Sequence, residues 1–199
     1  MRERDEPEVL APGGGWHSDR RPDRVYSSQQ AKEIIAEMRE NAKDPQTADV
    51  VALQRVARLR VSEATMIPGE DLDVEECKVR VVKGTKGGRF RTVHVDEGHA
   101  DFLARLKRRA EGHRDGHVLQ GRGCRGQSLA SRTNGSVRHA CERLGIECYG
   151  THGFRKTWAQ EQYRRSREEG LDDCESRQEL ARGLGHNGRE VTYSYVLRR

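Results

Sequence analysis

The chain has 199 residues, which is enough for one domain with a substantial core and short for two. Hydrophobic residues make up 33% and charged residues 35%, so we expect a lean core under a heavily ionised surface. No apolar run approaches membrane length, and the first residues lack a signal-peptide pattern, so we expect no membrane span and no secretory signal. Five cysteines without a Cys-x-x-Cys pair indicate reduced thiols in a cytoplasmic protein.

Positive charge is concentrated in the middle of the chain. The net charge is +5, and the stretch from Asp101 to Gly170 holds fifteen Lys/Arg against eight Asp/Glu. Such an excess favours a polyanionic partner such as nucleic acid, although an arginine-rich solvated surface explains the count equally well. The eight histidines are scattered and none forms a ligand pair backed by cysteines or carboxylates, so we expect no metal site.

The N-terminal part predicts a leader followed by helices. Residues 1–26 mix both signs of charge with Pro and Gly, which is typical of a flexible leader. Ser27 and Gln30 have capping-box spacing, so we expect the first helix to begin there and to stop near Pro45. Its apolar face would hold Ile34, Ile35 and Met38. A second helix is expected through residues 50–56, and a third, short one from about 61.

In the middle of the chain, the spacing of apolar residues changes from a helical to a strand-like pattern. Residues 77–81 and 90–95 alternate as strands do, and the Gly-rich stretch 84–88 between them predicts a β-hairpin. A helix with an apolar face follows near 102–106. Further helices are expected over roughly 128–144, 152–169, 175–184 and 189–197. The predicted fold class is therefore α+β and mainly α, with a small antiparallel sheet near residues 77–95.

Reactive side chains occur at separate points of this arrangement. One arginine lies in Leu-Arg-Val-Ser-Glu at a loop-to-helix transition, and a lysine lies at the tip of the hairpin. A His-x-x-Arg motif places its two side chains on one helix face. A Gly-His pair near the C-terminus precedes a tyrosine by nine positions, counted from the histidine. These candidate catalytic residues are Arg60, Lys86, His152, Arg155, His186 and Tyr195.

The order and spacing of these elements resemble the catalytic domain of the tyrosine recombinases, the phage-integrase family. The resemblance covers residues 27–199, so the chain is expected to be that domain, with no N-terminal core-binding domain evident. It implies a site-specific recombinase or integrase that cleaves and rejoins DNA strands through a 3′-phosphotyrosyl intermediate. It also implies that the reaction needs no metal and no cofactor.

The resemblance implies a role for each candidate. Arg60 and Arg155 would hold the non-bridging phosphate oxygens, a task that suits the permanently charged guanidinium fork. Lys86 would protonate the 5′-oxygen leaving group. His152 would assist proton transfer and His186 would hydrogen-bond the phosphate. The remaining residue, Tyr195, would attack phosphorus.

Several of these residues also have a simpler structural interpretation. Arg60 could form an ion pair with Glu63 at the start of a helix, and His152 could cap its helix. Lys83 competes with Lys86 for the same role. Tyr193 is the rival nucleophile, but it lies seven positions after His186 instead of nine, so we expect it to pack or to face solvent.

Double-stranded DNA is the expected partner, together with self-association on DNA and accessory DNA-bending proteins. A basic helix face and one lysine next to the His-x-x-Arg motif are the candidate DNA-binding residues. These are Arg105, Arg108, Arg109 and Lys156. The expected location is the cytoplasm, in association with the nucleoid of a prokaryotic or phage-bearing cell.

Three departures from the family pattern bear on function. Arg58 occupies a position where family members usually have Gly, and a left-handed backbone there would cost a non-Gly residue about 1 kcal/mol. The usual N-terminal clamp domain is not evident, and only four residues follow Tyr195. Two alternatives follow from these departures. One is a DNA-binding integrase-like paralogue or fragment with little cleavage activity, and the other is a type IB topoisomerase-like relaxer.

Overall fold

A computed structural model describes residues 24–83, 90–120, 125–185 and 189–196. The side chains of residues 125–128 and 189 also lie outside the description. The predicted leader therefore falls almost entirely outside the described residues, and so do the two candidate residues Lys86 and His186. None of the helices in the described part is both long and apolar enough to cross a membrane.

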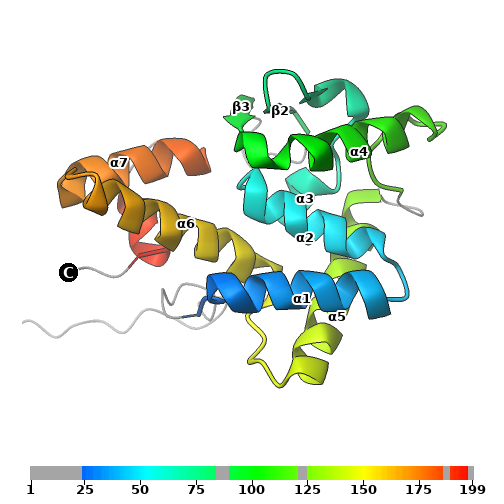
Figure 1. The fold of residues 1–199 in the computed structure, drawn as a ribbon, viewed down its shortest axis with the longest axis horizontal. Helices are drawn as coiled ribbons and strands as arrows, with labels where there is room; N and C mark the ends of the chain where they lie inside the picture. The colour runs from blue at the N-terminus through cyan, green and yellow to red at the C-terminus, as the bar shows by residue number, and fades with distance from the viewer. Residues whose placement is uncertain (1–23, 84–89, 121–124, 186–188, 197–199) are drawn as a thin grey trace, which may run out of the picture.

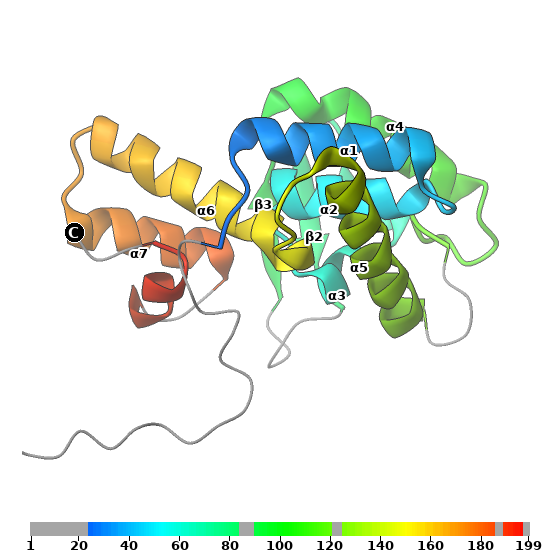
Figure 2. The same ribbon diagram turned by 90° about the horizontal axis from the view of Figure 1, so that it is seen from below.

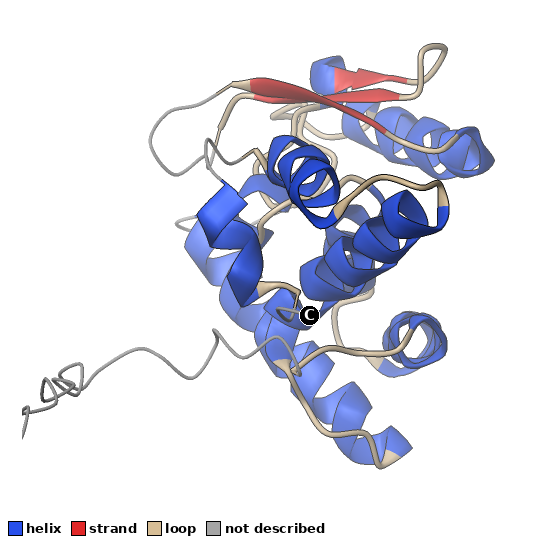
Figure 3. Ribbon diagram, turned by 90° about the vertical axis from the view of Figure 1, so that its left-hand side faces the viewer, coloured by secondary structure: helices blue, strands red, loops and turns tan. Residues whose placement is uncertain are grey.

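The fold is a helical body covered on one side by a small sheet (Figures 1 and 3). Its order agrees with the sequence prediction that the chain is mainly α with an early antiparallel sheet. The α-helices are α1 (Ser28–Asn41), α2 (Gln46–Val56), α3 (Val61–Ala64), α4 (Ala100–Glu111), α5 (Arg125–Leu144), α6 (Gly150–Glu168) and α7 (Asp173–Leu184). The strands are β1 (Leu72–Asp73), β2 (Lys78–Val81) and β3 (Arg91–His94), and the 3₁₀ helices are η2 (Gly69–Asp71), η3 (Glu97–His99) and η4 (Arg189–Ser194).

Helix α1 begins as its sequence predicts. The Ser27 hydroxyl accepts a hydrogen bond from the Gln30 backbone N–H at 3.1 Å, and the Gln30 side chain accepts one from the Ser27 N–H at 2.9 Å. This reciprocal pair is a capping box, which satisfies two N–H groups that the helix leaves unpaired. The predicted apolar face is buried, so the predictions of the cap and of the core face are both confirmed.

The sheet has the order β1-β2-β3, with both pairs antiparallel. Val79 pairs with Val93 and Val81 with Arg91, so the register places alternate residues of β2 and β3 on one face. That face is buried at Val79, Val81 and Val93. The predicted hairpin is confirmed, whereas β1, with only two residues, had no detectable alternation and was missed.

Among the described residues, buried apolar side chains form three clusters. The first lies between the sheet, α2 and α4, and the second joins α1, α5 and the start of α6. The third joins the second half of α6, α7 and the C-terminal segment, and it contains Tyr195 and Leu184. Helices α6 and α7 form an antiparallel pair with η4 beneath them (Figures 1 and 2). The sequence predicted a helix over 189–197, and the structure has the 3₁₀ helix η4 over Arg189–Ser194. Short helical segments often form the tighter 3₁₀ turn.

Candidate active site

The first part of the site is built at the start of α3. Glu63 is completely buried, and its carboxylate accepts the Arg60 backbone N–H at 2.7 Å and the Arg60 Nη1 at 2.9 Å. The ion pair that the sequence allowed as an alternative role for Arg60 therefore exists. It uses one nitrogen of the Arg60 fork, and the Arg60 side chain is 25% exposed. The ion pair and a role in binding an anion are therefore compatible.

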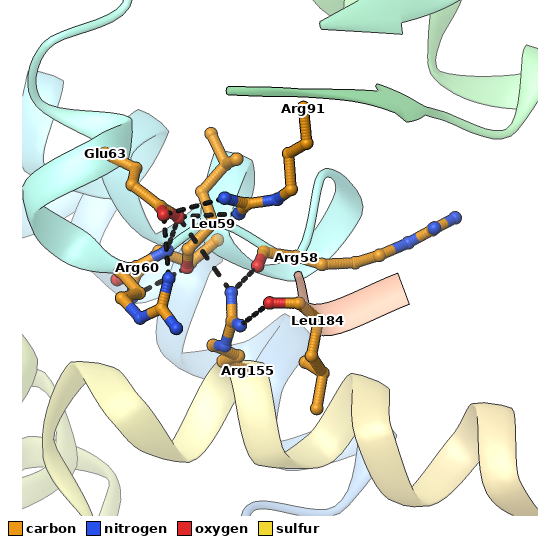
Figure 4. Close-up of polar contacts among 8 residues, drawn as sticks. Arg58, Leu59, Arg60, Glu63, Arg91, Arg155 and Leu184 are labelled. Carbon is orange, nitrogen blue, oxygen red and sulfur yellow. Dashed lines mark hydrogen bonds and ion pairs between the residues drawn. The ribbon is translucent and has the colours of Figure 1, made fainter. Parts of the chain in front are cut away.

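A second arginine reaches the same carboxylate from the sheet (Figure 4). Arg91, the first residue of β3, donates both Nη1 and Nη2 to Glu63, each at 2.8 Å. Burial raises the pKa of Glu63, but the hydrogen bonds from Arg91 and from the Arg60 backbone outweigh it and lower that pKa overall. Glu63 is therefore a carboxylate at neutral pH, so it draws cations together at this point.

Arg91 was not among the predicted site residues, although the sequence contains a signal for it. Side chains two apart along a strand share a face, so Arg91 shares one with the buried Val93. An arginine at such an inward position needs a buried partner. The same side chain packs under the end of α7, because a Cβ added at Gly185 would lie 2.8 Å from the Arg91 Cδ. Gly185 also has a φ of 70°. Glycine suits this helix end because it has no Cβ to meet Arg91 and because it adopts a left-handed backbone without strain.

Arg155 lies at the centre of the site and has no exposed surface. Its Nη1 donates to the carbonyl oxygen of Arg58, and its Nη2 donates to that of Leu184 at 2.5 Å. The Arg155 Nη1 also lies 4.0 Å from a Glu63 oxygen. Burial lowers the pKa of Arg155, but an ordinary arginine pKa lies so far above neutrality that the group stays charged.

Helix α6 brings Arg155 to this position. Its first turn crosses Tyr26 at a glycine: a Cβ on Gly153 would lie 2.5 Å from the Tyr26 ring. The Tyr26 hydroxyl accepts the Tyr149 N–H at 2.8 Å and donates to the Gly150 carbonyl at 3.2 Å. These contacts fix the turn before α6, and with it the direction of the His-x-x-Arg motif.

The structure brings Tyr195 to this arginine. The Tyr195 phenol interacts electrostatically with the Arg155 guanidinium, which raises the Arg155 pKa against the larger effect of burial. The His152 ring lies beside the phenol, with ring centroids 5.4 Å apart. Tyr195 is 5% exposed, and the Gln160 Nε2 donates to its carbonyl at 3.2 Å. Four of the six predicted catalytic residues, namely Arg60, His152, Arg155 and Tyr195, therefore lie in the same part of the fold.

The rival tyrosine faces a different cation. The Tyr193 ring lies 4.2 Å from the Arg177 guanidinium carbon, outside the Arg155 cluster. Arg177 is 1% exposed and also donates to the Val196 carbonyl at 3.4 Å. The spacing argument predicted that Tyr193 packs or faces solvent, and here it packs on Arg177.

The departure at Arg58 is visible in the backbone. Arg58 has a φ of 57°, in the left-handed region that favours glycine. Its side chain lies over the Trp158 ring, 4.6 Å from the centroid, and its Nη2 donates to the His94 carbonyl at 2.9 Å. The chain therefore keeps the left-handed corner that a Gly would make, and the Arg58 carbonyl at that corner accepts from Arg155.

The predicted DNA-binding arginines of α4 lie on a different side of the molecule from α3 and η4 (Figure 2). Arg105 and Arg109 of α4 bind the buried Asp49 of α2, at 2.8 Å and 2.5 Å. In Figure 2, α4 follows the upper edge of the molecule while α3 and η4 lie at the lower edge. Lys156 is 1% exposed, so a DNA contact by its ammonium would require a rearrangement. DNA contacts by these residues and by Arg108 stay a prediction.

The arrangement can bind an anion next to a nucleophile. Three arginines, Arg60, Arg91 and Arg155, surround one carboxylate, which leaves a net positive charge in a largely dry site. A phosphoryl group with developing negative charge suits such a site, because preorganised cations act strongly where water is excluded. Within the described ranges, no group of three or more His, Cys, Asp or Glu side chains gathers as metal ligands.

Comparisons with known proteins bear on this geometry. The model of the phage integrase family matches residues 24–196, which is most of the chain. No curated protein matches the sequence. The crystal structure of XerA recombinase is similar to the chain with a TM-score of 0.65 and 19% identity, over 88% of this chain and 60% of that one.

Two further solved structures extend the comparison. The XerH site-specific recombinase, bound to its palindromic difH substrate in a post-cleavage complex, gives a TM-score of 0.65 and 16% identity over 88% of this chain. The match covers 49% of XerH, so the chain spans about half to three fifths of these two recombinases. The catalytic domain of bacteriophage HP1 integrase gives a TM-score of 0.60 and 21% identity, over 86% of this chain and 85% of that domain. At these identities the structures show a shared fold.

Proposed function

The chain belongs to the phage integrase family, and from this membership we propose that it is a site-specific DNA recombinase. The reaction is cleavage and rejoining of DNA strands through a covalent phosphotyrosine. The observation that carries the proposal is the position of Tyr195, whose ring lies 5.4 Å from the His152 ring and whose phenol interacts with Arg155. A tyrosine next to an arginine in a buried, cationic site suits attack on a phosphodiester that the same arginine binds.

The proposed steps use this chain's own side chains. Arg60 and Arg155 hold the non-bridging oxygens of the scissile phosphate. The Tyr195 hydroxyl loses its proton, with His152 assisting, and its oxygen forms a bond to phosphorus. The bond from phosphorus to the 5′-oxygen breaks, and Lys86 supplies a proton to that oxygen. The product is a 3′-phosphotyrosyl link and a free 5′-hydroxyl.

Rejoining is the reverse reaction with another strand. A 5′-hydroxyl attacks the phosphotyrosyl phosphorus, and the Tyr195 oxygen leaves and recovers a proton. The number of phosphodiester bonds is unchanged, so no external energy source is needed. His186 is proposed to hydrogen-bond the phosphate throughout. Neither step needs a metal ion, because the arginines supply the charge that a metal would otherwise supply.

The proposed partners follow from the chemistry. The proposed substrate is double-stranded DNA; among similar solved structures, XerH is bound to its difH substrate and the Tn1549 transposon integrase is in complex with transposon right end DNA. Exchange of strands between two sites needs more than one protomer, so we propose self-association on DNA, with accessory proteins that bend it. The place of action is then the cytoplasm, on the nucleoid.

A nicked duplex tests the chemistry. The nick lies just beyond the cleavage point, so the short 5′-hydroxyl fragment diffuses away and the covalent complex accumulates. The protein is incubated with a library of such duplexes in the presence of EDTA, and adducts are resolved on a denaturing gel. We expect an adduct with the wild-type protein and with Tyr193→Phe, and none with Tyr195→Phe.

Other outcomes separate the alternatives. Salt-sensitive DNA binding without any adduct would contradict the proposal and favour a binding-only protein. Relaxation of supercoiled DNA without site preference would favour a topoisomerase-like enzyme. An adduct that survives in Tyr195→Phe but is lost in Tyr193→Phe would refute the assignment of the nucleophile. An adduct that forms only without EDTA would refute metal independence.

A further inference from the structure

The Glu63 carboxylate binds two arginines, Arg60 and Arg91. Its two oxygens accept four hydrogen bonds: two from Arg60, through the backbone N–H and Nη1, and two from the Arg91 fork. A fork that donates both nitrogens to one carboxylate makes the strongest pair of this kind. Arg60 gives only one nitrogen of its fork, and the Arg155 Nη1 stays at 4.0 Å. Arg91 is therefore the main neutralising partner of Glu63.

The position of Arg91 suits that task. It begins β3, where Arg91 is in register with Val81 and the strand is fixed by its pairing with β2. Its side chain is 14% exposed and lies against Gly185, at the end of α7. The Arg91 side chain thus connects the sheet to the end of α7 and to Glu63. It approaches Glu63 from the sheet, whereas Arg60 approaches from the start of α3 and Arg155 from α6 (Figure 4).

Loss of Arg91 would leave a buried carboxylate short of two hydrogen bonds. A buried carboxylate without these hydrogen bonds raises the free energy of the folded state, so we expect the nearest cationic side chains to move toward it. These cations are Arg60, whose second fork nitrogen does not bind Glu63, and Arg155, which already lies at 4.0 Å. The scissile phosphate would then compete with Glu63 for the two arginines.

We propose that Arg91 is a positioning residue for DNA cleavage: it saturates the Glu63 carboxylate and so leaves the Arg60 and Arg155 charges to the scissile phosphate. This inference rests on the proposed function for its kinetic effect, but not for its structural one. It assigns Arg91 no contact with DNA.

The kinetic experiment measures adduct formation on the nicked duplex. Removing a direct transition-state donor costs roughly 100-fold or more, and a residue acting through another costs less, so we expect about a tenfold slower rate for Arg91→Ala. DNA affinity should change no more than it does in the control Arg80→Ala. Arg80 lies on the neighbouring strand β2, and its side chain is 59% exposed and pairs with Asp71, away from Glu63. Arg91→Lys should recover part of the rate.

A double substitution separates this mechanism from simple loosening of the fold. If Arg91 acts by neutralising Glu63, its loss should cost less than about threefold in a Glu63→Gln background, because no carboxylate remains to compete. The same tenfold loss in both backgrounds would refute the proposal. If Arg91→Ala lowers the melting temperature and slows the reaction equally in the wild-type and Glu63→Gln backgrounds, Arg91 has a structural role alone.

A crystal structure of Arg91→Ala without DNA gives a test that needs no catalysis. We expect Arg60 to bind Glu63 through both fork nitrogens, or the Arg155 Nη1 to move from 4.0 Å to hydrogen-bond distance. If both arginines keep their present positions, the proposal is wrong. If the wild-type protein forms no adduct at all, the proposed function fails, and this structure still decides the role of Arg91.

Discussion

A single residue, Arg58, shows how a chain keeps a backbone conformation without the usual glycine. Its φ of 57° places its Cβ close to its own carbonyl oxygen, which costs roughly 1–2 kcal/mol. The ring contact with Trp158 and the hydrogen bond to His94 offset this cost, since each is worth about 1 kcal/mol. The side chain and the strained backbone therefore act together to hold the carbonyl that Arg155 uses.

Two substitutions separate these contributions. Arg58→Ala keeps the strain and loses both contacts, so we expect a loss of about 1–2 kcal/mol in the free energy of unfolding. Arg58→Gly loses the same contacts but removes the strain, so its stability should lie within about 1 kcal/mol of the wild type. Urea denaturation of the three proteins measures both values. Equal stability of the Ala and Gly variants would show that the left-handed corner carries no strain.

At the scale of elements, a buried arginine contributes to holding the C-terminal segment. Arg177 of α7 binds Asp173 through Nε at 2.9 Å, lies against the Tyr193 ring and donates to the Val196 carbonyl. The ion pair with Asp173 lies within α7, whereas the contacts with Tyr193 and Val196 join α7 to η4 and to the segment after it. The position of Tyr195, the proposed nucleophile, therefore depends in part on contacts that Arg177 makes with its neighbours Tyr193 and Val196.

Arg177→Met should loosen η4 while it keeps an apolar stem of similar length. We expect faster cleavage by chymotrypsin at the C-terminal tyrosines and slower adduct formation, with DNA affinity within about twofold because no charge is lost near α3. Arg182→Met, an exposed position on the same helix, is the matched control and should leave both rates unchanged. Unchanged proteolysis in Arg177→Met would mean that η4 is held by its apolar contacts alone.

Another pair of elements, α2 and α4, is joined by Asp49. This carboxylate is 5% exposed and accepts from Arg105 and Arg109. Burial raises its pKa, but the hydrogen bonds from Arg105 and Arg109 outweigh this effect and lower the pKa overall. The two arginines that the sequence suggested for DNA therefore have a partner inside the fold.

Acid should weaken this contact with a defined sign. Because the folded-state pKa of Asp49 is lowered, its contribution is complete above the unfolded carboxyl value of about 4 and is lost as pH falls through the folded value. Asp49→Asn should cost about 1–3 kcal/mol of unfolding free energy at pH 7, reduced from a fully buried pair because both arginines are partly exposed. The difference from wild type should shrink below about pH 4. The control Asp101→Asn, at an exposed position of α4, should show no such difference, and a gap for Asp49→Asn that persists at low pH would contradict this account.

At the scale of the whole molecule, the sequence predicted what local chemistry determines. The capping box at Ser27, the alternation of β2 and β3 and the order of helices all follow from short-range rules. Contacts between distant residues could not be predicted in this way. The Arg91 fork reaches Glu63 across 28 positions, and Arg105 reaches Asp49 across 56.

The same division holds for the site. The resemblance to a family predicted Tyr195, Arg155 and His152 as site residues, and in the structure their side chains are neighbours. The sequence could not predict that Arg155 donates to the carbonyls of Arg58 and Leu184, because every residue type has the same backbone carbonyl. Lys86 and His186 remain predictions outside the described residues.

The burial of Arg155 has a consequence for which phosphodiesters can react. Arg155 has no exposed surface and interacts with the Tyr195 phenol, so in the proposed reaction an incoming phosphate must first open this buried centre. A small diester brings only its own few contacts to that task. A duplex brings many contacts remote from the cleavage point, and their binding energy can be used to open the centre. Under the proposed function, the closed centre therefore favours long DNA over free nucleotides as a substrate.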